Sequence, residues 1–247
     1  IASQIDNLTG NVTSFAYDVN NQMTQSITRN ASGASLSTTT YEIGVDGTSR
    51  QRQSVDNLTG NATNFTYGAN NQMLSSVTTN SQGAALSTSL FETGLDGQAR
   101  IASQTDNLTG NVTVFSYDSN NQMTQSVTRN ATFTLLSTTN YEIGVDGQSR
   151  QRESIDALTG NITSFKYDGN NQLTRAQVKN PAGRTLSTTA YEIGVDGQSR
   201  QRESVDNLTG NVTTFAYNAN NQMTQSVTTN SQGQAISTSV YETGIDG

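Results

Sequence analysis

The sequence lacks cysteine and histidine altogether, has no tryptophan, and contains a single proline, Pro181. Without cysteine there can be no disulfide and no thiolate metal site. Histidine is the side chain that most often serves as a general base or a transition-metal ligand near neutral pH, so its absence removes the commonest routes to catalysis and to zinc or iron binding. We therefore expect no catalytic residue, no metal ligand and no cofactor site.

Charged residues and long hydrophobic runs are also scarce. Only 13% of the residues are charged and the net charge is -7, without any basic stripe, so nucleic acids and anionic membrane surfaces are poor candidate partners. No apolar run approaches the roughly 20 residues that a membrane-spanning helix needs, and membrane insertion is not expected. Because apolar residues make up 32%, a thin one-sided hydrophobic layer is expected instead of a thick core.

What the sequence does contain is a repeat. The stretch from Leu8 to Ser26 returns at Leu58 and then in three further copies, each shifted by 50 residues. We interpret residues 1–247 as one repeat array, because repeats of this kind bury their faces on their neighbours. Its units are residues 1–50, 51–100, 101–150, 151–200 and 201–247. The chain begins within a unit at Ile1, which indicates a segment of something longer.

Each unit reads as a set of strands. Residues 11–18 alternate in polarity and place Thr13, Phe15 and Tyr17 on one face. The same three residue types recur in every copy, whereas the intervening positions vary and include Lys166. Since lysine is tolerated where water is the neighbour, the Phe and Tyr face is expected to point inward. Three further strands are expected in the first unit, over residues 22–30, 36–45 and 50–56.

The same alternation assigns faces in these later strands. Met23 and Ile27 are expected on the inward face, as are Tyr41 and Ile43. In the fourth copy, Gln177 stands where the other copies have Ile or Val, and a bulge or a slipped residue is expected there.

The segments between the strands have the composition of turns. Gly10, Gly44 and Gly47 recur in every copy, as expected where the backbone needs a positive φ or a close approach. Asp6 and Asp46 begin turns, where a short carboxylate can accept hydrogen bonds from backbone N–H groups. A pair of acids at glycosidase spacing and a calcium site are both possible readings of such recurrent carboxylates, but the turn role is preferred.

These elements predict an all-β fold class: tandem 50-residue repeats of four antiparallel strands that form a continuous curled or spiral β-sheet. Twenty strands exceed the roughly ten that an open twisted sheet usually holds without curling or splitting. The alternative is a five-bladed β-propeller, whose blades pack face to face and need both faces apolar. The second face here is rich in Ser, Thr, Asn and Gln, which favours the continuous sheet.

Large side chains that recur on the inward face form the expected structural repeat core. They are Phe15, Tyr17, Met23, Tyr41, Phe65, Tyr67, Met73, Phe91, Phe115, Tyr117, Met123, Tyr141, Phe165, Tyr167, Leu173, Tyr191, Phe215, Tyr217, Met223 and Tyr241. Because these rings are periodic, a role in packing is preferred to a role in ligand binding.

The run FAYDVNNQMTQS, from Phe15 to Ser26, resembles the Rhs or YD repeat, in which a Tyr-Asp pair precedes a short turn and then Leu and Thr. A second match begins at Tyr41 and keeps a Tyr-acid pair, a glycine turn and Arg50. The sequence departs from the pattern where Gln22 replaces the usual arginine. The resemblance implies a spiral β-sheet shell of the kind found in bacterial toxins and cell-surface proteins, in which the repeats are container or scaffold and chemistry lies in other domains.

The leading functional hypothesis is therefore a non-enzymatic structural array, a wall or casing segment of a larger bacterial secreted or cell-surface protein. The resemblance implies an extracellular or cell-surface location. Its expected partners are further repeats or domains of the parent protein, an enclosed polypeptide or a surface glycan. The alternative hypothesis is a multivalent carbohydrate-binding module built as a five-bladed propeller.

Overall fold

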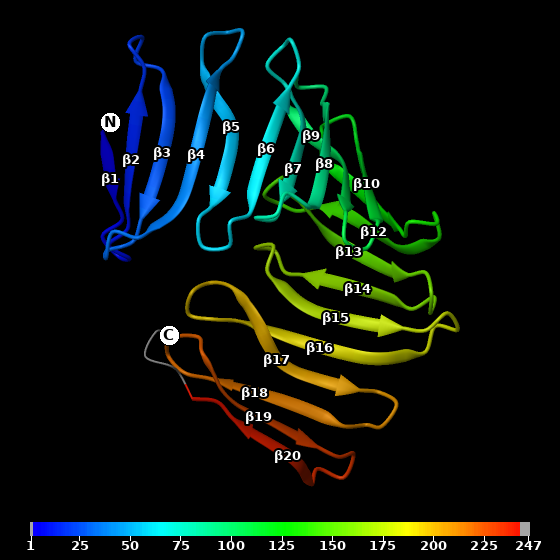
Figure 1. Cartoon of the computed structure of the whole chain (residues 1–247). Helices are drawn as coiled ribbons and strands as arrows, with labels where there is room; N and C mark the ends of the chain where they lie inside the picture. The colour runs from blue at the N-terminus through cyan, green and yellow to red at the C-terminus, as the bar shows by residue number, and fades with distance from the viewer. Residues whose placement is uncertain (1, 243–247) are drawn as a thin grey trace. The chain divides into compact units, whose positions relative to one another are not determined.

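The structure is a computed structural model that describes residues 2–242, and every regular element in this part of the chain is a β-strand (Figure 1). Four strands recur in each 50-residue interval. Their bounds are β1 Ser3–Ile5, β2 Val12–Tyr17, β3 Met23–Arg29, β4 Ser35–Ile43, β5 Ser49–Asp56, β6 Ala62–Tyr67, β7 Met73–Thr79, β8 Ala85–Thr93, β9 Ala99–Asp106, β10 Asn111–Tyr117, β11 Met123–Arg129, β12 Leu135–Ile143, β13 Ser149–Asp156, β14 Ile162–Tyr167, β15 Leu173–Lys179, β16 Thr185–Ile193, β17 Ser199–Asp206, β18 Val212–Tyr217, β19 Met223–Thr229 and β20 Ala235–Val240.

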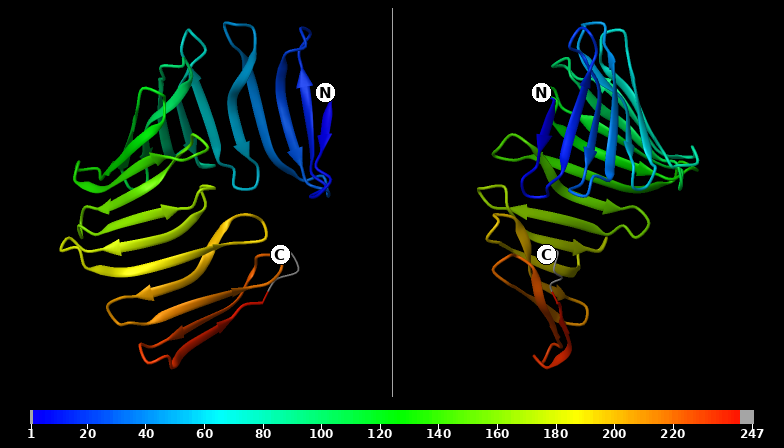
Figure 2. Two further views of the ribbon diagram at one scale, coloured as in Figure 1. Left: turned by 180° about the vertical axis from the view of Figure 1, so that it is seen from behind. Right: turned by 60° about the vertical axis from the view of Figure 1, so that its left-hand side comes forward.

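The chain divides into two compact units. The first contains Ile1–Asn121 and Thr128–Thr134, and the second contains Gln122–Val127 and Leu135–Gly247. Within each unit, strands that follow one another in sequence pair antiparallel, for example β4 with β5 and β5 with β6 in the first unit and β16 with β17 in the second (Figure 2). The twenty strands are assigned to one sheet.

This pairing confirms the all-β class, the four-strand repeat and the continuous antiparallel sheet, while the curl of the sheet stays a prediction. The β-propeller alternative is wrong, because separate blades would interrupt the ladder at each repeat boundary. Instead β5 spans the boundary itself and pairs with β4 on one side and β6 on the other.

Short turns connect the strands through the residues that the sequence singles out. Asp6 Oδ1 accepts the Leu8 N–H at 2.9 Å, as expected of a carboxylate at the start of a turn. Gly10 and Gly47 have φ values of 70° and 76°, which confirms the positive φ expected there. Gly44 meets the second expectation, close approach: a Cβ added to it would lie 2.6 Å from Asn71 Oδ1.

A bulge in the β2–β3 hairpin, with equivalents in the β6–β7, β14–β15 and β18–β19 hairpins, shifts the side-chain alternation. In the first copy, Ala16 pairs with Gln25 but Tyr17 pairs with Met23, so Thr24 is the extra residue of the bulge. Met23 therefore shares the Phe15 face, as expected. Ile27 pairs with the residue before Phe15 and lies on the opposite face, so its expected inward position is wrong.

The fourth copy keeps the common register. Gln177 pairs with Ser164 as Ile27 pairs with Ser14, and its neighbour Val178 pairs with Thr163. The extra bulge or slip expected at Gln177 is therefore wrong, because the only register shift in the β14–β15 pairing is the one that every copy has before its Tyr.

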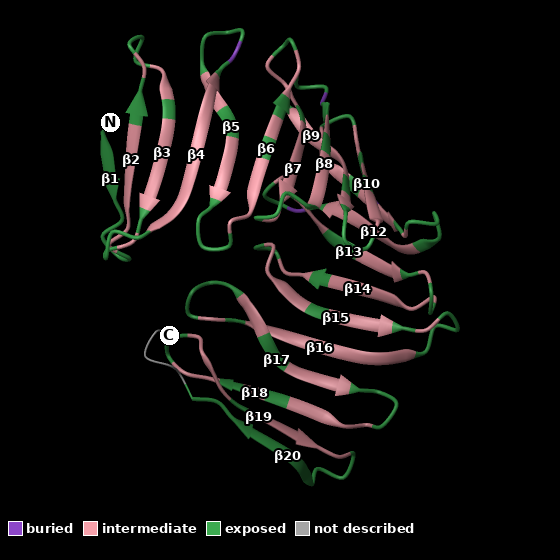
Figure 3. Cartoon of the chain, viewed as in Figure 1, coloured by how far each residue is buried: buried purple, intermediate pink, exposed green. Residues whose placement is uncertain are grey.

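The strands of residues 2–242 belong to a single sheet. No hydrophobic residue among residues 2–242 is fully buried, and most strand residues are half-buried (Figure 3). The Phe positions are half-buried, whereas the next position in each copy, from Ala16 to Ala216, is exposed. These side chains pack against neighbours in their own sheet.

The twenty residues expected to form the repeat core have this same environment. Eighteen are half-buried, and the two exposed ones belong to the first and last copies: Tyr17 at 40% and Tyr241 at 45%. Their role as a core stays a prediction. Hydroxyl pairs lie beside them on the Phe face, for example Thr13 and Thr28 with 2.9 Å between their Oγ1 atoms.

Candidate functional site

The most elaborate side-chain arrangement lies where one repeat meets the next. Arg50, on β5, stacks its guanidinium carbon 4.2 Å from the centre of the Tyr67 ring, on β6. A guanidinium over an aromatic face is attracted by the quadrupole of the ring. This contact ties the last strand of the first repeat to the first hairpin of the second.

The same arginine forms an ion pair with the strand on its other side. Arg50 Nε donates to Glu42 Oε1 at 2.8 Å, and Nη2 lies 2.7 Å from the same oxygen. Both side chains are partly exposed, at 21% and 37%, so the pair alone contributes at most about 1 kcal/mol. The ion pair orients the Arg50 guanidinium.

Asn71 completes the arrangement from the turn between β6 and β7. Its Oδ1 accepts hydrogen bonds from Arg50 Nη1 at 2.6 Å and from the Val45 N–H at 3.0 Å. Asn71 has a φ of 64°, a left-handed conformation that asparagine tolerates better than most residues. Gly44 makes room for its amide, because a Cβ at that position would collide with Oδ1.

The tyrosine hydroxyl supplies the last contact. Tyr67 donates to the Gln51 carbonyl at 2.8 Å. Partial burial raises the pKa of Tyr67, the nearby Arg50 guanidinium lowers it, and the Glu42 carboxylate raises it again. The hydroxyl therefore stays protonated and donating across the physiological range.

We call the set of Glu42, Arg50, Tyr67 and Asn71 the arginine clamp. It recurs three more times with the same contacts, and the distance from guanidinium to ring stays at 4.2 or 4.3 Å. The other clamps are Glu92, Arg100, Tyr117 and Asn121; Glu142, Arg150, Tyr167 and Asn171; and Glu192, Arg200, Tyr217 and Asn221.

Tyr17 is 40% exposed, whereas the four tyrosines that lie under an arginine are half-buried.

The side chains of the clamp are arranged to hold strands together and not to react with a substrate. The carboxylate, guanidinium and amide of the clamp are engaged with one another and its hydroxyl with the Gln51 carbonyl, so none is poised as a nucleophile or a general base. Among the described residues, no group of three or more His, Cys, Asp or Glu side chains could hold a metal ion.

The aspartates of the described residues serve the turns, as the sequence predicts for Asp6 and Asp46. Asp106 accepts the N–H groups of Leu108 and Thr109 at 2.9 and 3.2 Å. The Thr109 hydroxyl, followed by these two N–H groups, lowers the pKa of Asp106. Such a carboxylate is stabilised as an anion and is a poor proton donor, which does not fit the general acid of a glycosidase.

A cavity of about 240 Å³ lies beside this turn. It is lined by Leu86, Ser87, Gln104, Thr105, Asp106, Asn111 and Thr113. Asp106 is its only acid, and its Oδ1 is already engaged by the turn. The cavity therefore provides no acid–base pair.

Sequence reasoning found only part of the clamp. The tyrosines at 67, 117, 167 and 217 were expected in the repeat core, and the structure places them under an arginine. The Phe and Met positions lie outside the clamp, and Tyr41 instead has its hydroxyl 3.3 Å from Ser26 Oγ. Glu42 and Asn71 were missed as partners of Arg50. The available signal was their constant spacing from Gly44, a glycine that recurs in every copy.

Comparison with known proteins gives little further information. No protein family model matches the chain, and no curated protein matches it significantly. Among solved structures, a crystal structure of TcdB2-TccC3-Cdc42 is 14% identical with a TM-score of 0.37, over 88% of this chain and 15% of the other. A structure of the Photorhabdus luminescens Tc holotoxin pore is 13% identical with a TM-score of 0.34, over 93% of this chain and 18% of the other.

A porin-like protein from Bacteroides uniformis has a similar score. It is 13% identical with a TM-score of 0.38, over 94% of this chain and 95% of the other. The chain thus spans less than a fifth of the Tc toxin chains that it matches. At these TM-scores the likenesses carry no argument about function.

Proposed function

We propose that this chain is a non-enzymatic structural repeat array, a wall or casing segment of a larger bacterial secreted or cell-surface protein of the Rhs/YD type. The observation that carries the proposal is the arginine clamp, which recurs at four successive junctions with nearly constant geometry. Side chains that a catalytic site would leave available are used here to join one repeat to the next.

The clamps support an array that grows by addition of identical units. Each clamp joins residues from two neighbouring repeats, so a repeat is complete only with its neighbours present. Nearest-neighbour coupling of this kind makes the stability of a repeat protein a sum over units and interfaces. A segment of wall needs this property, because it must hold its form at any length.

The partners and the cellular location of the array are part of the same proposal. Further repeats or domains of the parent protein are its expected partners, and an enclosed polypeptide or a surface glycan is its expected contact. An extracellular or cell-surface location follows from the resemblance to the Rhs/YD family. The described residues include no helix long and apolar enough to span a membrane.

Removal of one whole repeat tests the proposal. Deleting residues 101–150 joins Arg100 to Gln151 and keeps the pattern of a repeat boundary. We expect the shortened chain to fold cooperatively, with a urea m-value lower by roughly a fifth, because m scales with the surface exposed on unfolding.

A matched deletion gives the control. Removing residues 101–125 leaves half a repeat and deletes Tyr117 and Asn121, the partners of Arg100 in its clamp, so it should prevent cooperative folding of the flanking strands. If both deletions unfold the chain equally, the copies are not interchangeable units and the proposed function is wrong.

A further inference from the structure

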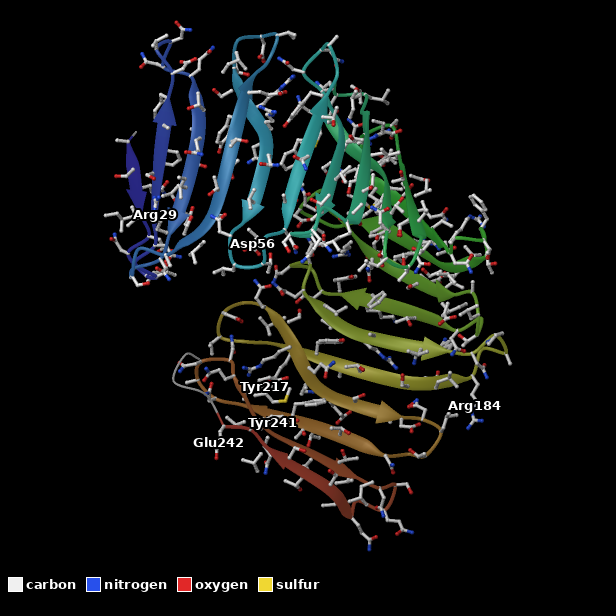
Figure 4. The ribbon with its side chains drawn as sticks, in the orientation of Figure 1. Arg29, Asp56, Arg184, Tyr217, Tyr241 and Glu242 are labelled. Carbon is white, nitrogen blue, oxygen red and sulfur yellow. The ribbon has the colours of Figure 1, made fainter. Side chains whose placement is uncertain are left out.

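The strand β9 departs from its equivalents in the other copies, and it lines the cavity beside Asp106. It has Gln104 where β5, β13 and β17 have serine, while the aspartate two residues later is common to all four strands. The equivalent aspartate of the preceding boundary, Asp56, lies at the end of β5 beside the turn into β6 (Figure 4). The cavity of about 240 Å³ thus combines a shared turn with a side chain that is particular to β9 among these strands.

The exchange of serine for glutamine leaves a side-chain amide without a partner. At the other boundaries the serine belongs to a hydroxyl pair: Ser54 Oγ lies 3.4 Å from Thr39 Oγ1, and Ser154 Oγ lies 3.3 Å from Thr139 Oγ1. Gln104 has the same register, but its side chain is exposed and makes no hydrogen bond with the described residues. The amide is therefore available to a ligand.

Side chains from three neighbouring strands meet around the cavity. Ser87 on β8 pairs with Asp106 on β9. On the other side, β10 places Asn111 opposite Asp106 and Thr113 opposite Gln104. Because residues directly opposite each other in a sheet share a face, these five side chains lie on one face and surround the same cavity.

Most of these side chains have hydrogen-bonding groups to offer. The Ser87 hydroxyl and the side-chain amides of Gln104 and Asn111 make no hydrogen bond with the described residues, whereas the Thr113 hydroxyl lies 2.9 Å from that of Thr128. Each amide carries two donors and an acceptor, and a hydroxyl serves as both. The cavity therefore suits a ligand with several hydroxyl groups, which also donate and accept.

The single charge of the cavity narrows the class of ligand. The turn lowers the pKa of Asp106, chiefly through the Thr109 hydroxyl and then the Leu108 N–H, so this carboxylate is ionised at neutral pH. A fixed negative charge repels an anionic ligand. Its Oδ1 already accepts two backbone N–H groups, and no cluster of acids in the described part of the chain could hold a metal ion. A neutral polar ligand is favoured.

The size of the cavity sets the size of the ligand. At about 240 Å³ it lies just below the roughly 300 Å³ at which pockets for drug-sized ligands begin, which suits one sugar ring. The lining residues include no aromatic ring on which a sugar could stack. Hydrogen bonds alone would hold the ligand, and a low affinity follows.

We propose that the cavity between β8, β9 and β10 is a binding site for one ring of a neutral sugar, whose hydroxyl groups bond to the amides of Gln104 and Asn111 and to the hydroxyl of Ser87. Gln104 is the residue that gives this boundary its specificity. The inference goes beyond the proposed function and does not depend on it, because an array forms a wall with or without a ligand at one boundary.

The test is a titration of the full chain, labelled with ¹⁵N, followed by NMR. The probes are glucose, galactose and mannose, each as the free sugar and as its methyl glycoside. We expect saturable shifts of the Ser87, Gln104 and Asn111 amides with a neutral sugar, and a dissociation constant on the order of 1–10 mM. Equal binding of the methyl glycoside indicates the end of a glycan as the source, and binding of the free sugar alone indicates a small molecule.

Charged sugars test the role of Asp106. Glucuronate should bind about fivefold more weakly than glucose, because its carboxylate meets that of Asp106. If protonated glucosamine binds more tightly than every neutral sugar, the site is one for a cation and the proposal is wrong.

Two substitutions exchange the residue that distinguishes the boundary. Gln104→Ser restores the serine of the other copies and should weaken binding about tenfold, with an unchanged urea midpoint. Ser154→Gln is the matched gain of function on β13 and should add a second set of saturable shifts. The residues around it already repeat the lining: Leu136, Ser137, Asp156, Asn161 and Thr163.

The outcomes separate this inference from the proposed function. The absence of any saturable shift with neutral sugars at concentrations on the order of 100 mM would overturn the binding site, as would equal binding by the Gln104→Ser variant. The chain without residues 101–150 should fold but not bind, because β13 and its serine then follow β8. Failure of that chain to fold counts against the array, and binding by it counts against the site.

Discussion

The β2–β3 hairpin of the first copy and the β14–β15 hairpin of the fourth carry different side chains on their faces but pair in the same register. Where the first has Ser26, Ile27 and Thr28, the fourth has Ala176, Gln177 and Val178. Phe15 still pairs with the first of the three in the one hairpin, and Phe165 in the other. Gln177 replaces the apolar Ile27 and Val178 replaces the polar Thr28, and the register stays the same.

The turns of the two hairpins are nearly identical. Asp18 Oδ1 accepts two backbone N–H groups at 2.8 and 2.9 Å, and Asp168 Oδ1 does the same. At the bulges, Thr24 and Thr174 donate their hydroxyls to the carbonyl across the hairpin at 3.3 and 3.1 Å. The comparison teaches that turns and bulges hold the register, whereas the side chains on the faces are free to vary.

The sharpest way to break this comparison is to change a turn residue. Asn171→Ala should destabilise the chain by about 3 kcal/mol, because alanine is strained at positive φ by about 1–2 kcal/mol and the Val145 N–H and Arg150 lose an acceptor. The measurement is urea unfolding followed by circular dichroism.

Two variants control this prediction. Asn171→Gly relieves the strain but still lacks the acceptor, so it should cost about half as much. On the face of the hairpin, Gln177→Ile should change stability by no more than about 0.5 kcal/mol. If Gln177→Ile destabilises the chain as much as Asn171→Ala, the conclusion that turns matter more than faces is wrong.

The next largest effect is expected at the clamp. Arg150→Ala removes an ion pair, a hydrogen bond to Asn171 and the stacking on Tyr167, and should cost about 2 kcal/mol in urea unfolding. Arg152, on the same strand, is exposed and belongs to no ion pair of the described residues. Arg152→Ala is therefore the matched control and should leave the free energy of unfolding unchanged. Equal losses in the two variants would mean that the clamp does not contribute to stability.

The third copy provides a turn that departs from the others. Phe133 has a φ of 64° and is 80% exposed, where the second copy has Gly83 at a φ of 84°. Both turns keep the same 2.9 Å hydrogen bond to the carbonyl of the preceding asparagine, so the phenylalanine is held in a strained conformation. Phe133→Gly should raise stability by about 1 kcal/mol in thermal or urea unfolding. A loss of stability instead would show that the ring makes a contact worth more than its strain.

A smaller effect tests the freedom of the faces. Lys166 and Arg175 are exposed and directly opposite each other on β14 and β15, and like charges in that arrangement repel. Lys166→Thr should stabilise the chain by about 0.5 kcal/mol at low salt, and the gain should shrink as ionic strength rises. Lys179, which pairs with Ile162, gives the control: Lys179→Thr should show neither the gain nor its salt dependence.

The smallest effect concerns pH. The Leu208 N–H, followed by the hydroxyl and the N–H of Thr209, lowers the pKa of Asp206 in the folded chain. A carboxylate with a lowered pKa contributes stability that is present above its unfolded value, near pH 4, and is lost as the pH falls through the folded value. The urea midpoint should therefore decrease below about pH 4. Asp206→Asn keeps an acceptor that does not titrate and should flatten this decrease slightly. An unchanged pH profile of the urea midpoint would show that Asp206 does not contribute to the pH dependence of stability.

Much of this architecture could be predicted from residue types and spacing. Repetition at 50 residues fixes the number of units, alternation around Phe15 indicates strands, and the glycines at 10 and 47 mark positive φ. The turn role of Asp6 also follows, because a carboxylate two residues before an N–H in a turn forms its hydrogen bond locally. These properties depend on a few consecutive residues and need no tertiary information.

The face of Ile27 and the arginine clamp were decided only by the tertiary structure. A bulge adds one residue without a sequence signal of its own, and Thr24 thereby reverses the alternation between Met23 and Ile27. The clamp brings together residues that lie 8 and 21 positions from Arg50, on two neighbouring repeats. Which of several acids and amides the guanidinium meets depends on how three strands and a turn are aligned, and that alignment exists only in the folded sheet.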